Sequence, residues 1–256
     1  MWEYSINVNN TNKNVVKFLY SAVKRFTSDC NGLVAVNEEN SYSSILIGVE
    51  ESYKERLQTF LSRCITKSIC SFYKNDFLNK NLSIPLSDEL LSLAFRRAMI
   101  NFDKETDYYI ITRNLEFNKE MYLDSFYNFK LKKLQSKWRE LINLANDNRE
   151  FLLDRGAFMD LLKFLIDNID VSSAEIDVVQ NEEGYRIFTT QEEDILDIKS
   201  DEELVKSVID LSPQKINIYC NNTNSAIDLL SFMFEKRANI FMSERENEES
   251  LTFLRK

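Results

Sequence analysis

Hydrophobic side chains recur along this chain with two different periods, and changes of period divide it into three regions. Apolar residues spaced three or four positions apart predict helices that pack along one side, whereas alternation predicts half-buried strands. The expected regions are an N-terminal α+β region of order β-α-β-β-α, a central helical region, and a C-terminal α+β region of order β-β-α-β-α, at residues 1–85, 86–170 and 171–256.

The first region is predicted to contain strands and helices in alternation. Short apolar or alternating runs predict strands, and longer stripes predict helices. The expected elements are a strand at 4–8, a helix at 14–27, strands at 32–36 and 43–49, and a helix at 51–77. The segment 37–42 between the second and third strands is polar, so those two strands are expected to form an antiparallel hairpin.

The central region is expected to be all helix. Ser87 follows Pro85 and precedes two acids, a pattern typical of a helix N-terminus with Ser87 as the capping residue. Later stripes of apolar residues predict helices at 104–114, 122–146 and 149–168.

After residue 173, apolar and polar residues again alternate along the chain. Two strands, at 174–179 and 185–189, flank a turn in which Gly184 supplies a positive φ. A helix at 201–211, a strand at 215–219 and a helix at 225–237 complete the pattern, which is typical of helices packed on one face of a sheet. The predicted fold class is therefore α+β and mainly helical, a central helical bundle flanked by two small, mostly antiparallel β-containing layers.

The amino-acid composition excludes several classes of catalytic and binding site. The 256 residues include no histidine, which excludes Ser-His-Asp and Cys-His catalysis and HExxH zinc sites. The 4 glycines are isolated, so neither a P-loop nor a dinucleotide fingerprint is present. The 4 cysteines show no CxxC pairing and are expected to be free thiols. We expect no cofactor, no metal and no catalytic residue.

The N-terminal residues resemble no secretion signal, and no apolar run approaches the roughly 18 residues of a membrane span. The sequence therefore predicts a cytoplasmic protein without a membrane span.

The formal net charge of -9 lies almost entirely within residues 171–210. Nucleic acids and anionic membranes need a basic surface, so general binding to either is disfavoured. Within this acidic segment, residues 192–194 and 201–203 offer carboxylates to a hard cation, although the second trio also fits the first turn of a helix capped by Ser200. Asp103 and Asp107 are either paired carboxylates or ordinary helix surface.

One helix carries a concentrated positive charge. No acid interrupts the stretch 130–139, and its candidate partner-binding residues are Lys130, Lys132, Lys133, Lys137, Trp138 and Arg139. These side chains could grip an acidic protein partner or phosphate, with Trp138 as an anchor. They could instead form a solvated face with Trp138 in the core, or dock on the acidic segment of the same chain.

Three stretches of sequence carry a resemblance to a known family: residues 123–131, the hairpin strands around Gly184, and residues 211–219 with 234–237. The chain resembles the YtxC-like family of sporulation proteins of endospore-forming Firmicutes, most strongly from residue 86 onward. It departs from the family pattern at Ser125, Lys130 and Tyr219. The resemblance implies a cytoplasmic protein connected with spore formation and carries over no catalytic residue.

These observations favour a non-catalytic protein-interaction factor over an enzyme, with protein partners of unknown identity. The alternatives are a carboxylate-based metal-dependent enzyme and a nucleic-acid-binding module.

Overall fold

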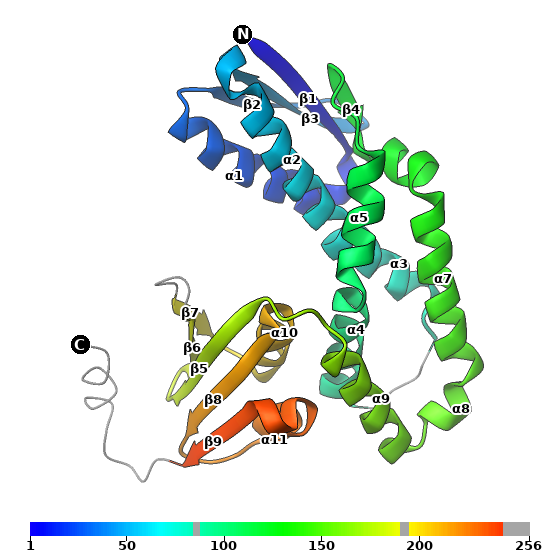
Figure 1. Ribbon diagram of the computed structural model, residues 1–256, viewed down its shortest axis with the longest axis vertical. Coiled ribbons are helices and arrows are strands. Elements are labelled where there is room, and N and C mark those ends of the chain that lie inside the picture. The colour runs from blue at the N-terminus through cyan, green and yellow to red at the C-terminus, as the bar shows by residue number, and fades with distance from the viewer. Residues whose placement is uncertain (84–87, 190–194, 243–256) are drawn as a thin grey trace. The chain divides into compact units, whose positions relative to one another are not determined.

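The computed structural model describes residues 1–83, 88–189 and 195–242. The chain folds into two compact units, and each combines two separate stretches of sequence (Figure 1). Unit 1 consists of Met1–Ser83 and Lys104–Asp147, and unit 2 contains the described residues of Ile84–Asp103 and Asn148–Lys256. The helices predicted for residues 86–170 therefore divide between the two units, because each packs on the sheet-bearing part of its own unit.

Unit 1 contains a four-stranded sheet of order β2-β3-β1-β4. The strands are β1 (Trp2–Asn9), β2 (Leu33–Glu38), β3 (Tyr42–Val49) and β4 (Glu120–Tyr122). The predicted β2–β3 hairpin is confirmed, and β1 pairs antiparallel with β3. The prediction that residues 86–170 are all helix is wrong, because β4 forms there and pairs parallel with β1. Its three residues are too few to show a period.

Most helices of unit 1 follow the predicted stripes, but the helix predicted at 122–146 is broken, because Leu131 leaves the helical conformation with φ of -102° and ψ of 26°. The helices of this unit are α1 (Lys13–Asp29), α2 (Lys54–Ser68), α3 (Lys74–Asn81), α5 (Lys104–Asn114), α6 (Leu123–Ser125) and α7 (Lys132–Asp147), with π-helical turns η3 (Ile69–Tyr73) and η4 (Phe126–Lys130) and 3-10 turns η1 (Asn10–Asn12) and η2 (Glu51–Tyr53). Helix α1 packs on one face of the sheet and against α2. Apolar side chains from that face, from these helices and from α5–α7 form one buried core.

Unit 2 contains a five-stranded sheet of order β7-β6-β5-β8-β9. The strands are β5 (Ser173–Asn181), β6 (Gly184–Thr189), β7 (Ile195–Ile198), β8 (Pro213–Cys220) and β9 (Ala238–Met242). The β5–β6 hairpin is confirmed, with φ of +139° at Gly184. β6 and β7 are also antiparallel, whereas β5–β8 and β8–β9 are parallel. The sheet is therefore mixed, rather than mostly antiparallel as predicted, because α10 and α11 serve as crossovers between parallel strands.

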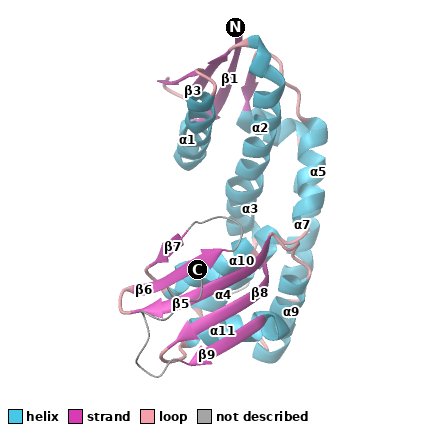
Figure 2. Ribbon diagram, turned by 60° about the vertical axis from the view of Figure 1, so that its left-hand side comes forward, coloured by secondary structure: helices cyan, strands magenta, loops and turns pink. Residues whose placement is uncertain are grey.

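Helices cover one face of this sheet (Figure 2). On this face α10 (Asp201–Leu211) packs with α4 (Glu89–Asn101), and α11 (Ser225–Phe234) packs with α9 (Arg155–Asp167). Helix α8 (Arg149–Leu152) packs against α9, and a 3-10 turn, η5, lies at Glu235–Arg237. The helix predicted at 149–168 is broken, because Asp154 accepts a hydrogen bond from the Ala157 amide and begins α9 anew. Asp88 caps α4, and the predicted cap Ser87 lies outside the described residues.

The two sheets and their helices confirm a mainly helical α+β fold. No helix in the described part of the chain has both the length and the apolar character required to cross a membrane.

Candidate functional site

The predicted basic residues separate into an exposed group and an internal group. Lys130 ends η4, and Lys132 and Lys133 begin α7; all three side chains are exposed. Phe129 precedes them and is itself 71% exposed. We call these four residues the Phe129–Lys133 surface. None of its three lysines forms an ion pair with any residue that the structure describes.

Lys137 and Trp138 point into unit 1 instead. Lys137 Nζ lies 2.8 Å from Asp107 Oδ1, and Trp138 Nε1 donates a hydrogen bond of 3.0 Å to Asp107 Oδ2. Lys74 from α3 completes this group, with Nζ 2.8 Å from Asp107 Oδ2. Asp107, Lys74 and Trp138 are all buried. The interpretation with Trp138 in the core is therefore confirmed.

The remaining predicted residue, Arg139, is exposed, and its guanidinium lies over the Phe77 ring, 5.9 Å from the centroid. The predicted set of six residues therefore does not form a single surface. Lys130, Lys132 and Lys133 face solvent, whereas Lys137 and Trp138 fix α7 to α3 and α5 through Asp107.

Burial sets the protonation of this internal group. Loss of water lowers the pKa of the Lys74 ammonium, and the adjacent Asp107 carboxylate opposes that change. Burial, followed by the charge of Asp107, raises the pKa of the nearby Cys70 thiol to about 12. Cys70 is therefore a protonated thiol near neutral pH and has no nucleophilic thiolate.

Asp107 was expected to be ordinary helix surface or one of a carboxylate pair with Asp103. Both expectations are wrong for Asp107, because its carboxylate is fully buried and is neutralised by two lysines. Asp103 precedes α5 with φ of 54° and belongs to the other unit. The sequence carried no signal for this role, because Lys74 lies 33 positions from Asp107.

A second carboxylate anchors the segment that leads into the Phe129–Lys133 surface. Asp124 Oδ2 accepts a hydrogen bond of 2.7 Å from the Asn9 amide, and Oδ1 accepts bonds from Asn12 and from the Tyr73 hydroxyl at 2.7 and 2.9 Å. Asp124 thus ties α6 to the end of β1 and to η3. Burial and this carboxylate raise the pKa of Tyr73, which keeps its hydroxyl a donor.

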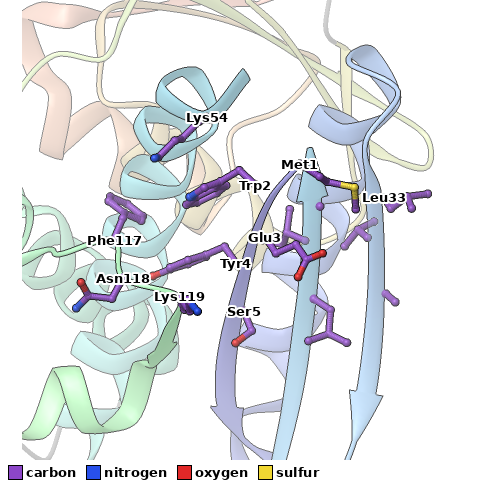
Figure 3. Close-up of a pocket in the computed structure, with 15 residues that line it drawn as sticks. Met1, Trp2, Glu3, Tyr4, Ser5, Leu33, Lys54, Phe117, Asn118 and Lys119 are labelled. Atoms are coloured by element: carbon purple, nitrogen blue, oxygen red, sulfur yellow. The ribbon is translucent and has the colours of Figure 1, made fainter. Parts of the chain in front are cut away.

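A cleft of about 1200 Å³ lies at the end of the unit 1 sheet where β1 begins (Figure 3). Trp2 and Tyr4 project from one side of β1 and stack at 5.4 Å, and Phe117 lies 5.6 Å from Tyr4. Lys54 and Lys119 lie at this aromatic side, while Met1 and Leu33 lie beyond β1 on the other side. The Tyr4 hydroxyl is buried and has no hydrogen-bond partner among the described residues.

The open face of the unit 2 sheet carries a polar cluster. Asn217 donates hydrogen bonds of 2.8 and 2.9 Å to Glu175 and Asp177, and Lys215 Nζ lies 2.7 Å from Glu175. The Lys215 ammonium and the Asn217 amide thus both bind the Glu175 carboxylate. The cluster therefore stabilises the pairing of β5 with β8.

The acidic segment behaves as a helix start where it is described. Ser200 caps α10, and Asp201, Glu202 and Glu203 occupy its first turn, as one interpretation predicted. Backbone and Ser200 hydrogen bonds lower the pKa of Glu202. Residues 192–194 lie outside the described residues. All four cysteines are buried free thiols, and no metal-binding group of three or more Cys, Asp or Glu side chains occurs within residues 1–83, 88–189 and 195–242.

Comparisons with known proteins gave no match to any family model, any curated protein or any solved structure. The resemblance to the YtxC-like family remains a hypothesis.

Proposed function

We propose that this protein is a cytoplasmic, non-catalytic interaction factor of sporulating cells that binds an acidic protein partner through the Phe129–Lys133 surface. The observation that carries the proposal is the 71% exposure of Phe129 beside three exposed lysines. Phenylalanine is among the residues enriched at protein interfaces, and the three exposed lysines beside it give this surface a positive charge that an acidic partner would complement.

The internal group supports this surface by holding it in place. Asp107 binds Lys137 and Trp138 one to two turns further along α7, and Asp124 fixes the turn that precedes Phe129. Both ends of the segment are thus anchored by buried or half-buried carboxylates. A surface held rigid before binding loses less conformational entropy when a partner binds.

The charge pattern favours a protein partner over nucleic acid. Each neutralised phosphate contributes to nucleic-acid affinity, and a stable complex needs many such contacts. Here three lysines and one phenylalanine occupy the surface of a protein with 41 acidic and 32 basic residues. A peptide segment with two or three carboxylates around an apolar side chain matches both features of the surface.

The proposal is tested by affinity purification from sporulating and vegetative cells with quantitative mass spectrometry. The test variant replaces Lys130, Lys132 and Lys133 with glutamate, and a second variant carries Phe129→Ala. The matched control replaces three exposed lysines of α1 in the same unit, Lys13, Lys17 and Lys24, with glutamate. Both triple variants change the net charge equally, so general electrostatic effects cancel.

The expected result is a partner that wild type and control retain and that both surface variants lose. Retention of the same partners by the charge-reversed variant would contradict the proposed surface. A separate measurement addresses the cellular role: loss of the protein should lower the yield of heat-resistant spores. An unchanged yield would reject the link to sporulation and leave the binding surface standing.

A further inference from the structure

Strand β2 is an apolar strand that lies at the edge of its sheet. Sheet order places β2 outermost, with β3 as its only paired neighbour among the described strands. Its first four residues, Leu33 to Val36, are all apolar. An exposed apolar strand at a sheet edge can pair with a strand of another chain, because its outer N–H and C=O groups have no partner in the sheet.

Side chains of β2 are exposed to solvent on both faces of the sheet. Val36 lies on the helix-covered face, as its pairing with the buried Ile45 shows, yet it is 36% exposed because the sheet ends there. Leu33 lies on the opposite face and is 68% exposed. Met1, which Figure 3 shows near Leu33, is exposed on that face, and the exposed Leu46 lies there too because it pairs with Ala35.

The other described sheet edges are shorter than β2. β4 has three residues and runs directly into α6. β7 has four residues; it exposes Ile195 and Leu196 and carries an ion pair between Asp197 and Arg186. β9 has five residues and also exposes Phe241 and Met242, while its Asn239 donates a hydrogen bond to Asn217. β2 has six residues without lysine, arginine or proline, the usual means by which proteins block pairing at an edge.

We propose that β2 pairs antiparallel with β2 of a second copy of this chain, which joins the two four-stranded sheets into one. A two-fold axis at Ala35 sets Val34 opposite Val36 of the second copy on the helix-covered face. It also sets Ala35 beside its own equivalent on the open face. This register preserves the two faces of both sheets, as regular antiparallel pairing requires.

The distribution of charge along β2 favours a second copy of the chain as the partner and antiparallel pairing as the direction. Residues 33–37 carry no charge, so no like charges meet along the paired strands. Glu38 and Glu39 of one copy lie at one end of the pairing, and those of the second copy lie at the other end. Parallel pairing in register would bring the Glu38 side chains of the two copies together, which is destabilising. The inference does not rest on the proposed function, because the Phe129–Lys133 surface contains no residue of β2.

Sedimentation velocity of the full chain over a wide concentration range tests the inference. Ala35 is the informative position, since the axis places its side chain next to its equivalent. Ala35→Lys and Ala35→Asp each set two like charges side by side, and each variant is expected to be monomeric at concentrations where wild type is a dimer. An equimolar mixture pairs lysine with aspartate and is expected to restore the dimer. Glu120→Lys, at the opposite edge of the same sheet, is the control and should remain dimeric.

Circular dichroism establishes that each variant is folded, and rescue by mixing separates loss of pairing from loss of folding. A wild-type protein that stays monomeric at every concentration would overturn the inference. So would a dimer that Ala35→Lys leaves intact, because its interface would then lie elsewhere.

Discussion

Asp107 joins three helices of unit 1, α3, α5 and α7, through its side-chain contacts. Its carboxylate is fully buried and is served by the Lys74 and Lys137 ammoniums and the Trp138 indole. The free energy lost when these charges are removed from water offsets most of the free energy gained from their mutual attraction. The group as a whole therefore adds little net stability. Removal of one charge is different, because the others remain buried without compensation. The arrangement therefore fixes how three helices pack more than it stabilises the fold.

Asp107→Asn keeps the shape of the side chain and removes its charge, and it is expected to lower the free energy of unfolding by about 3–5 kcal/mol. The control Lys133→Ala, one turn before Lys137 on α7 and exposed, should change it by no more than about 0.5 kcal/mol. Urea denaturation measures both. A cost for Asp107→Asn as small as that of the control would mean that the carboxylate charge is not needed to position α7.

The buried thiols predict how stability depends on pH. Burial raises the pKa of Cys64 to about 11 and that of Cys70 to about 12, from 9.0. Above pH 9 an unfolded thiol loses its proton while the folded thiol keeps it, so the folded state binds more protons. The free energy of unfolding therefore falls as pH rises, by about 1.4 kcal/mol per pH unit for each thiol, up to the folded pKa.

Urea titrations between pH 7 and 11 under reducing conditions measure this slope. Cys70→Ala removes one of the two thiols and should give a shallower decline above pH 9, even though the variant is less stable at pH 7. Equal slopes for the variant and wild type would show that Cys70 keeps an ordinary pKa in the folded protein.

At the scale of elements, periodicity predicted long segments well and short ones poorly. The helices α1, α5 and α10 and both hairpins lie where the spacing of apolar residues placed them, whereas the helix predicted at 122–146 is continuous only from Lys132 onward. β4, β7 and β9 were not predicted, because their lengths of three to five residues are too short for a clear alternation. The stripe over 149–168 appeared continuous, although Asp154 interrupts it with an N-terminal cap that apolar spacing does not report.

Asn224 links three elements of unit 2 and gives a test at this scale. Its Oδ1 accepts a hydrogen bond from the Ile227 amide and caps α11, while its Nδ2 donates to the Tyr185 hydroxyl of β6 at 2.6 Å and to Asp201 of α10 at 3.1 Å. Ser200→Ala removes a simple cap from α10 and should cost about 1 kcal/mol. Asn224→Ala removes a cap and two further bonds, so about 2 kcal/mol or more is expected.

Urea midpoints of the two cap variants, analysed with a common slope, give this comparison directly. Adding Tyr185→Phe to each variant isolates the contribution of the hydroxyl. Equal costs for Ser200→Ala and Asn224→Ala would show that Asn224 acts as a cap and nothing more.

At the scale of the whole molecule, each unit is assembled from stretches that are distant in sequence. Unit 2 takes α4 from before the α5–α7 segment and α8–α11 from after it. Helical stripes report that a face is buried but not which partner buries it. The grouping of the chain, like the pairing of Lys74 with Asp107, therefore depends on contacts between distant residues that no local pattern encodes. The exposure of Lys137 and Trp138 was uncertain from the sequence for the same reason.

The C-terminal region 171–256 was delimited from sequence as a separate α+β layer, and the structure predicts that it does not fold without the helices before it. α10 packs on α4, and α11 packs on α9. Asp210 of α10 is bound by Arg97 and by Asn101 of α4, the latter at 2.9 Å. Arg237 donates to the Ile166 carbonyl at the end of α9 at 3.2 Å. Without α4 and α9, the fragment would expose apolar helix surface and leave these partners unpaired.

Two fragments test whether residues 171–256 need α4 and α9 in order to fold. Residues 171–256 alone should show weak, non-cooperative urea unfolding, whereas residues 84–103 joined by a flexible Gly/Ser linker to residues 148–256 should unfold in one cooperative transition. Amide hydrogen exchange in β5 and β8 reports the same difference, because their ladder is protected only when the layer above it is complete. Cooperative unfolding of residues 171–256 alone, with a slope appropriate to their size, would show that α4 and α9 are additions to a self-sufficient layer rather than part of its core.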